Sequence, residues 1–374
     1  MSTSVWRPEA VATIDRSTAF AAPIITRADV PPLLPGIHLW DLWPVQTRTG
    51  ATAEIAGGAL FMLLSAPTLP NPDDRHAIAR IRLMHRVGGD WRDLGPLLPD
   101  GFAPGSREWA GSAILSDSGG RVTLYFTAAG RRGESAITFE QRLFETSAEL
   151  HVDGSAPRLI GWTPPIESVA PDGVIYVQEM AGGRAIGTIK AFRDPAWFRD
   201  PVDDSEYLLF TASLAQSRSN WNGAVGVARR EEGRWRLLPP IITADELNNE
   251  LERPHVVMHG GRYYCFWSTQ AKVFAAGGPV GPNGLYGMVA DALSGPWAPL
   301  NGSGLVLANP PAAPFQAYSW LVLADLSVLS FADLIGVDHV PSDPAQLRAH
   351  FGGTPAPAVR LAIDGDRAGP RVSR

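Results

Sequence analysis

Tyr263-Tyr264-Cys265-Phe266-Trp267 is the stretch of this chain that points most directly to its fold. It is a short apolar run rich in aromatic residues, and polar residues follow it. Its length and residue types predict a buried β-strand, because a helix of a globular protein is usually longer. Cys265 is the only cysteine of the chain, so no intrachain disulfide can form. Nothing beside it would stabilise a thiolate, and we expect the thiol to pack in the core.

Similar runs recur along the chain, bounded by Gly, Pro, Asn and Asp, and their β-branched and aromatic content favours strands. Further examples are residues 60–64, 122–127, 207–212, 224–228 and 285–289. A helical pattern is scarce and predicts at most a short helix at 344–350. The pattern is typical of an all-β sandwich, barrel or propeller. No repeat of about 40 residues stands out, so periodicity alone does not single out a propeller.

The length of 374 residues is compatible with two domains or with one large all-β domain. No stretch has the composition of a linker. We therefore expect a single domain over residues 1–374. An N-terminal extension over about 1–36 should pack on it, and a tail over about 364–374, which has little apolar content, should fray.

Charge and hydropathy narrow the possible partners. The net charge of −6 and the pI of about 5.8 argue against a nucleic-acid partner, which would require clustered Lys and Arg. The most apolar segment, 317–337, is interrupted by Asp325 and Asp333, so it predicts two strands and no membrane span. The N-terminus shows no basic region followed by an apolar stretch. No conventional signal peptide is visible, and we expect a cytoplasmic protein or one exported by an unconventional route.

Three acidic motifs lie far apart in the chain: His38-Leu39-Trp40-Asp41-Leu42-Trp43-Pro44, Phe192-Arg193-Asp194-Pro195 and Glu250-Leu251-Glu252-Arg253-Pro254. Each sets a carboxylate beside a Trp or an Arg. Chemistry at the acetal carbon of a sugar needs one carboxylate as nucleophile and a second group that gives and takes a proton. A third carboxylate can hold hydroxyls and stabilise the developing positive charge. The motifs supply one candidate for each role.

The first two motifs also have structural interpretations. Asp41 fits a turn within an aromatic cluster, although a Trp face commonly carries a sugar ring. The sequence Phe-Arg-Asp-Pro occurs twice, at 192–195 and 198–201. We favour Asp194 over Asp200 because it follows an apolar stretch and is better placed for burial, and a buried Asp must be paired or hydrogen-bonded.

The third motif has two readings of equal weight. On a strand, Glu250 and Glu252 share one face, and their repulsion raises the pKa of at least one carboxyl, as a general acid requires. Alternatively, they form a solvated acidic edge next to Asn248 and Asn249.

Other chemistries lack their signatures. The chain has no Gly-x-Ser-x-Gly motif and no phosphate-binding glycine loop. Its eight His residues show no zinc-ligand spacing. Asp203, Asp204 and Glu206 could chelate Ca²⁺, but acidic loops of this kind are usually just solvated. We therefore expect no cofactor and no metal.

Taken together, the motifs resemble glycoside hydrolase family 68, the levansucrases, inulosucrases and related β-fructofuranosidases. The similar segments follow the order of the family, and the resemblance covers residues 40–365. They are residues 40–44, 108–112, 192–195, 252–254, 299–307, 316–319 and 352–354. The resemblance implies a five-bladed β-propeller with a central funnel-shaped active-site pocket. It also implies a retaining enzyme with sucrose as fructosyl donor and water or a sugar as acceptor.

The resemblance further implies a role for each candidate residue. Asp41 would attack C2 of the fructosyl unit, Glu252 would act as general acid and base, and Asp194 would stabilise the transition state. The carboxyls of Asp41 and Glu252 would lie about 5–5.5 Å apart, as retention requires. The expected substrate-binding residues are Trp40 and Trp109 (walls of the fructosyl site), Arg193 and Arg253 (hydroxyl binding), Glu250 (glucosyl side), Gln270 (acceptor side) and Tyr318 (hydrogen bonds among the acids).

Three positions depart from the family pattern. Ala110 stands where many levansucrases carry a Ser that supports the nucleophile, and Thr211-Ala212-Ser213 replaces a common Glu-Gly-Asn run. Gln270 falls where relatives have an Arg or His associated with chain elongation. We therefore expect intact cleavage followed by hydrolysis or by synthesis of short fructo-oligosaccharides. The alternatives are a levansucrase that makes long fructan, another five-bladed propeller glycosidase, and a non-catalytic carbohydrate-binding propeller.

Overall fold

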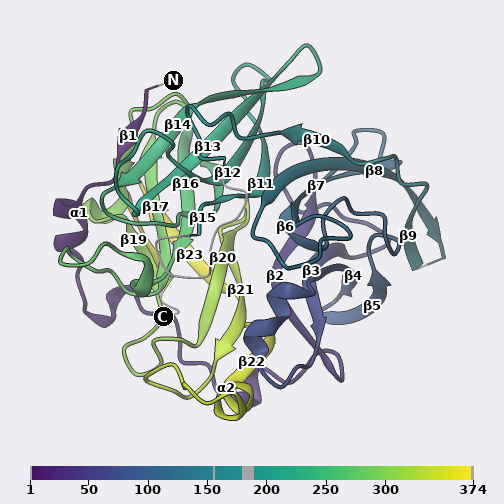
Figure 1. Ribbon diagram of the computed structural model, residues 1–374, viewed down its shortest axis with the longest axis horizontal. Helices are drawn as coiled ribbons and strands as arrows, with labels where there is room; N and C mark the ends of the chain where they lie inside the picture. The colour runs from purple at the N-terminus through teal and green to yellow at the C-terminus, as the bar shows by residue number, and fades with distance from the viewer. Residues whose placement is uncertain (1, 155, 179–188, 372–374) are drawn as a thin grey trace.

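The computed structural model describes residues 2–154, 156–178 and 189–371. Strands make up 50% of it and helices 8%, as the apolar runs predicted. Figure 1 shows the strands arranged around the middle of the molecule, with the two termini on the same side. No helix in these ranges has the length and hydropathy of a membrane span.

Within the described residues, the first half of the chain forms a nine-stranded sheet with the order β10-β8-β7-β6-β2-β3-β4-β5, and β9 lies beside β8. The pairing between β2 and β6 is parallel and short, whereas the other pairings are antiparallel. The strands are β2 (Ile37–Gln46), β3 (Ala59–Pro67), β4 (Arg80–Val87), β5 (Asp90–Pro96), β6 (Arg107–Leu115), β7 (Arg121–Ala129), β8 (Gln141–Asp153), β9 (Ala156–Ile160) and β10 (Ile166–Val169).

The rest of the described chain forms three five-stranded sheets. The first has the order β1-β14-β13-β12-β11 and contains β1 (Ser4–Val5), β11 (Phe192–Arg199), β12 (Glu206–Ser213), β13 (Asn222–Glu231) and β14 (Arg234–Asp245). The second contains β15 (Glu252–His259), β16 (Arg262–Thr269), β17 (Gly284–Ala290), β18 (Ala298–Pro299) and β19 (Leu305–Ala308). The third contains β20 (Ala317–Val322), β21 (Ser327–Leu334), β22 (Phe351–Pro355), β23 (Val359–Asp364) and β24 (Arg367–Pro370).

Five strands of the described chain close a ring. β2 contacts β6, β6 contacts β11, β11 contacts β15, β15 contacts β20, and β20 contacts β2. In Figure 1 these strands lie near the centre of the view, and the strands that follow each of them lie farther out. The ring brings together segments that are far apart in the sequence, including all three acidic motifs.

The N-terminal segment packs along the sheets. β1 pairs in parallel with β14, and the fully buried Trp6 donates from Nε1 to the carbonyl of Ser303 at 2.9 Å. The amide of Ile25 donates to the side-chain oxygen of Gln316 at 2.8 Å. Its helices are α1 (Pro8–Ala12), η1 (Thr18–Phe20) and η2 (Arg27–Asp29).

The remaining helices are short. They are η3 (Pro72–Ala77), η4 (Ala271–Val273), η5 (Leu300–Gly302) and α2 (Pro344–His350). The helix predicted at 344–350 is confirmed as α2, which begins with a proline and is capped by Asp343, whose carboxylate accepts from the Gln346 amide. The segment 317–337 contains two strands, β20 and β21, as predicted.

Two expectations about single segments have clear outcomes. Cys265 is fully buried in the core beside Trp267, and burial raises the pKa of its thiol, so the prediction of a packed cysteine is confirmed. The prediction of a frayed tail from residue 364 is wrong as far as Pro370. β24 pairs with β23 from Asp364↔Arg367 to Leu361↔Pro370, and Ala368 is buried. Pairing with β23 orders a segment that has little apolar content of its own.

Candidate active site

The five strands of the ring each carry a register shift, a β-bulge, at a corresponding place. The shifts lie between Trp40 and Trp43, Trp109 and Gly111, Arg193 and Ala196, Glu252 and His255, and Tyr318 and Leu321. A bulge locally re-aims side chains and is frequent next to active sites. In four of the bulges one residue has a positive φ, which is rare outside glycine: Asp41 (44°), Asp194 (60°), Arg253 (51°) and Ser319 (61°). Asp41, Asp194 and Arg253 therefore lie in β-bulges at corresponding places of the ring strands.

Arg193 lies at the centre of the acidic cluster. Its Nη2 is 2.6 Å from Oε1 of Glu252 and 3.4 Å from Oε2 of Glu250, and its Nε is 3.5 Å from Oδ2 of Asp194. Burial of the guanidinium lowers its pKa, but these three carboxylates outweigh that effect and raise the pKa above its usual value. Tyr318 donates a hydrogen bond to the second oxygen of Glu252, as expected. Burial and the charge of Glu252 raise the pKa of the Tyr318 hydroxyl, so it remains a donor.

Asp41 faces the same cluster. Burial raises the pKa of its carboxyl, while the charge of Arg253 and a hydrogen bond from Ser319 lower it. Glu252 is close enough for its charge to raise that pKa as well. Ala110, in the position where a supporting Ser was expected, is buried. The hydroxyl beside Asp41 comes instead from Ser319, across the ring contact between β2 and β20.

Arg253 makes contacts that differ from the expected hydroxyl binding. Its Nη1 donates to the carbonyl and the hydroxyl of Ser319 at 3.1 and 2.9 Å, and its Nη2 donates to the carbonyl of Leu42 at 2.9 Å. The guanidinium is therefore bonded to Leu42, the residue after Asp41, and to Ser319 of β20, whose hydroxyl bonds to Asp41. In this geometry it positions the nucleophile candidate and supplies positive charge.

Asp194 is held by hydroxyl groups of neighbouring strands. Thr211 donates to its Oδ2 at 3.0 Å, and Thr127 accepts from its amide at 2.8 Å. Burial raises the pKa of the Asp194 carboxyl to about 6, the charge of Arg193 opposes this rise, and the charges of Glu252 and Asp41 add to it.

The supporting hydroxyls were missed in the sequence. In register, Thr127 faces Trp109, Thr211 faces Arg193, and Ser268 faces Glu252, so each lies opposite a bulge. Ser268 likewise accepts from the amide of Trp320 at 2.9 Å. A hydroxyl opposite a bulge is recognisable only once the strand pairing is known.

Glu250 and Glu252 meet, but not by strand alternation. β15 begins at Glu252, and Glu250 lies in the preceding turn, where its amide donates to Oδ1 of Asn248 at 2.8 Å. Asn248 and Asn249 are both fully buried, which rules out a solvated acidic edge. Burial raises the pKa of Glu250 to about 7, Arg193 lowers it, and the neighbouring Glu252 raises it further. The predicted pKa rise is therefore present at Glu250.

Asp200, the near-copy of Asp194, is also buried but has a different role. It accepts from the hydroxyl of Tyr263 at 2.6 Å and from the amide of Val202 at 3.0 Å. It caps the turn after β11, as a structural Asp would. The preference for Asp194 is consistent with this geometry, because Asp194 alone of the two joins the acidic cluster.

Of the remaining candidates, Trp40 and Trp109 contact η3 and Gln270 contacts Tyr318. Trp40 is buried, and the guanidinium of Arg75 lies over its ring at 5.4 Å. Trp109 donates from Nε1 to the carbonyl of His76 at 3.2 Å. Gln270 is a hydrogen-bond neighbour of Tyr318 and lowers the pKa of its hydroxyl.

The acidic loop at 203–206 forms local ion pairs. Asp204 pairs with Arg199 at 2.9 Å, Glu206 pairs with Arg48 at 2.6 Å, and Asp203 accepts from the amide of Ser205 at 3.0 Å. In the part of the chain that the structure describes, no group of three or more His, Cys, Asp or Glu residues is arranged to hold a metal ion.

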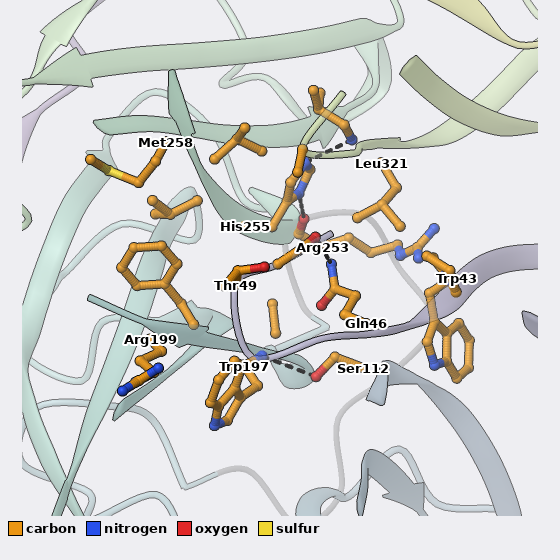
Figure 2. A pocket seen from close by; sticks show the side chains of 18 of the residues that line it. Trp43, Gln46, Thr49, Ser112, Trp197, Arg199, Arg253, His255, Met258 and Leu321 are labelled. Atoms are coloured by element: carbon orange, nitrogen blue, oxygen red, sulfur yellow. Dashed lines mark hydrogen bonds between the residues drawn. The ribbon is translucent and has the colours of Figure 1, made fainter. Parts of the chain in front are cut away.

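A cavity of about 230 Å³ lies on the C-terminal side of the bulges. Figure 2 shows Trp43, Ser112, Trp197, His255 and Leu321 around it. Asp194 and Arg253 also line it, and Asp194 is the one acidic residue among its described lining residues. Asp41, Glu250 and Glu252 are not among the lining residues, so Asp194 alone connects the acidic cluster with this cavity.

Comparisons with known proteins cover almost the whole chain. A family profile described as levansucrase/invertase, of glycoside hydrolase family 68, matches residues 2–227 and 218–372. A levansucrase of Rahnella aquatilis is 31% identical over 409 residues, covering 98% of this chain and 93% of the relative. The levansucrase LscB of Pseudomonas savastanoi pv. glycinea is 32% identical, covering 98% and 90%.

Solved structures are similar over the same extent. An inulosucrase from Halalkalicoccus jeotgali bound to kestose superposes with a TM-score of 0.90 at 39% identity, covering 99% of this chain and 95% of that chain. A levansucrase from Gluconacetobacter diazotrophicus superposes with a TM-score of 0.84 at 25% identity, covering 99% and 90%.

Proposed function

The chain belongs to glycoside hydrolase family 68, and from that premise we propose that it cleaves sucrose by a retaining mechanism and passes the fructosyl unit to water or to a sugar. The cluster around Arg193 carries this proposal, because it holds three carboxylates of different environment within one site. We further propose that a single catalytic domain, a five-bladed β-propeller with a central funnel-shaped pocket, supports the site. The closed ring of inner strands is consistent with this architecture.

The first half of the reaction breaks the bond between C2 of the fructosyl unit and the bridging oxygen. Asp41 attacks C2 and forms a covalent ester, while Glu252 gives a proton to the departing glucose oxygen. Asp194 accepts hydrogen bonds from fructosyl hydroxyls and stabilises the positive charge that develops at the anomeric centre. Burial raises the pKa of the Asp41 carboxyl, and Arg253 and Ser319 oppose this rise, so both favour the charged form that attacks.

Glu250 supplies a source for the catalytic proton. Burial raises the pKa of Glu250 to about 7, and a side-chain hydrogen bond joins Glu250 to Glu252. A protonated Glu250 can therefore pass its proton directly to Glu252. The hydroxyl of Tyr318 and the guanidinium of Arg193 fix the two oxygens of Glu252. In the second half of the reaction Glu252 removes a proton from the acceptor, which then attacks C2 and releases Asp41.

The identity of the acceptor is the finer part of the proposal. Relatives at about 31% identity are named levansucrases, so long fructan is the main alternative product. Gln270, beside Tyr318, favours hydrolysis and short fructo-oligosaccharides. A different propeller glycosidase and a non-catalytic sugar-binding protein are the remaining alternatives.

A time course of product release from sucrose tests the proposal. Equal release of glucose and fructose means hydrolysis, and fructose lagging behind glucose means transfer. Mainly high-mass fructan would contradict the assignment of short products.

Asp41→Asn should lower glucose release by at least about 10³-fold with the fold retained. No glucose from the native enzyme, with release from arabinan or inulin instead, would point to another glycosidase. Sugar binding without turnover would point to a binding protein.

A further inference from the structure

Asp333 is an acidic residue near the candidate site, and the proposed mechanism gives it no role. It lies in β21 at a register shift, between Ala332, which pairs with Thr354, and Leu334, which pairs with Phe351. Its side chain is partly exposed. Among the residues that the structure describes, no hydrogen bond or ion pair engages its carboxylate. A partly buried carboxylate without a partner is costly unless something else bonds to it.

Phe351, which pairs with Leu334, the residue after Asp333, contacts residues near the expected fructosyl site. The ring of Phe351 lies 4.5 Å from the guanidinium carbon of Arg75 and 4.8 Å from the ring of His38. Arg75 in turn lies over the ring of Trp40, the expected wall of the fructosyl site. The Nδ1 of His38 and the Nε of Arg75 are buried and have no hydrogen-bond partner within the described chain. These two atoms have no accessible surface, so Asp333 is the partly exposed polar group on this side of Trp40 that has no partner among the residues named here.

Backbone pairing places Asp333 beside the ring strand β20: its amide donates to the carbonyl of Gln316 at 2.9 Å, two residues before Tyr318. Burial raises the pKa of the Asp333 carboxyl to about 6, the charges of Arg75 and Lys272 oppose this rise, and the charge of Asp41 makes a smaller contribution to it. Lys272 follows Gln270 by two residues in the sequence. Asp333 lies outside the ring of bulges that surrounds Arg193, so a sugar that reaches it must extend beyond the unit held by Asp41 and Asp194.

We propose that Asp333 binds hydroxyl groups of the acceptor sugar and so helps to decide between transfer and hydrolysis. An ionised carboxylate only accepts hydrogen bonds, and neighbouring hydroxyls of a sugar ring can donate to both of its oxygens. The acceptor class is a neutral oligosaccharide, such as a second sucrose or a short fructo-oligosaccharide. This inference rests on the proposed function.

The test compares Asp333→Asn and Asp333→Ala with the native enzyme at rising sucrose concentration. Glucose release reports cleavage, and the difference between glucose and free fructose reports transfer. The transferred fraction should fall about tenfold, the effect of losing a hydrogen bond to a charged group, and this fall should exceed any fall in glucose release. Asp338→Asn is the matched control, because Asp338 is exposed and bonds only to His339 among the described residues.

A purely structural role predicts another result. Cleavage and transfer would then decline together with the melting temperature, and an unchanged transferred fraction would overturn the inference. A native enzyme that only hydrolyses at every sucrose concentration would also overturn it. A native enzyme that releases no glucose from sucrose would instead refute the proposed function. If Asp333→Ala does not fold, the near-isosteric Asp333→Asn still gives the ratio.

Discussion

The hydroxyl of Thr211 donates to Oδ2 of Asp194 across 3.0 Å. The same hydroxyl accepts from the amide of Arg253 at 3.0 Å, so one side chain of β12 joins the bulges of β11 and β15. The departure from the family pattern at this position was expected to affect acceptor choice. The contacts of Thr211 are instead with Asp194, the candidate transition-state stabiliser, and with the backbone of Arg253.

Thr211→Val should therefore lower the turnover of sucrose. The valine keeps the shape of the side chain but leaves Oδ2 of Asp194 without its donor and the Arg253 amide without its acceptor. Hydrogen bonds to charged groups contribute about 1.5–3 kcal/mol, so kcat for glucose release should fall by about 10- to 100-fold. Thr211→Ser should retain most of the activity. Thr123→Val is the control, because Thr123 bonds to Ser147 instead. Equal activity of the valine and serine variants would contradict this role.

Asp194 and Asp200 should respond differently to the same substitution. Asp194→Asn removes a charge from the acidic cluster and should lower glucose release by about 10²–10³-fold, the usual effect of removing one electrostatic stabiliser. Asp200→Asn weakens the bond from Tyr263 and should lower the melting temperature while kcat per folded molecule stays near the native value. Steady-state kinetics and thermal unfolding of both variants separate the two effects. A catalytic defect in Asp200→Asn at full stability would be unexpected.

The strands could be predicted from the sequence because each apolar run is a local signal. The runs at 263–267 and 285–289 lie within β16 and β17. The ring could not be predicted in this way, since it depends on contacts such as that between β2 and β20, whose sequences are far apart.

The site was predicted partly for the right reason. Burial was the argument for Asp194 over Asp200, yet both side chains are buried. The bulge and the partners Arg193 and Thr211 distinguish Asp194, and bulges follow from strand register that a single sequence does not display. Likewise, Glu250 and Glu252 were expected to meet on a strand, but a turn capped by Asn248 brings them together.

Glu250 should make the stability of the protein depend on pH. Its pKa is raised from 4.5 to about 7 in the folded state, so its contribution is fully present below about pH 4.5 and is lost as the pH rises toward 7. Glu250→Gln mimics the protonated form. The melting temperature of the variant should therefore gain on that of the native protein between about pH 4.5 and 7. Glu149→Gln, at an exposed position, is the control. Melting curves that stay parallel across this range would show that Glu250 titrates normally.

Gln270→His should shift the products toward transfer. Gln270 is a hydrogen-bond neighbour of Tyr318, which in turn donates to Glu252, so the residue is one hydrogen bond removed from the partner of the proposed acid/base. An imidazole at this place offers a ring nitrogen to a sugar hydroxyl. We expect a larger lag of fructose behind glucose and longer oligosaccharides, measured by chromatography of the products at fixed sucrose conversion. Gln270→Ala separates the two causes, because it removes the contact with Tyr318 without adding a new donor. If the alanine and histidine variants give the same product profile, then the loss of Gln270, and not the gained imidazole, controls the partition.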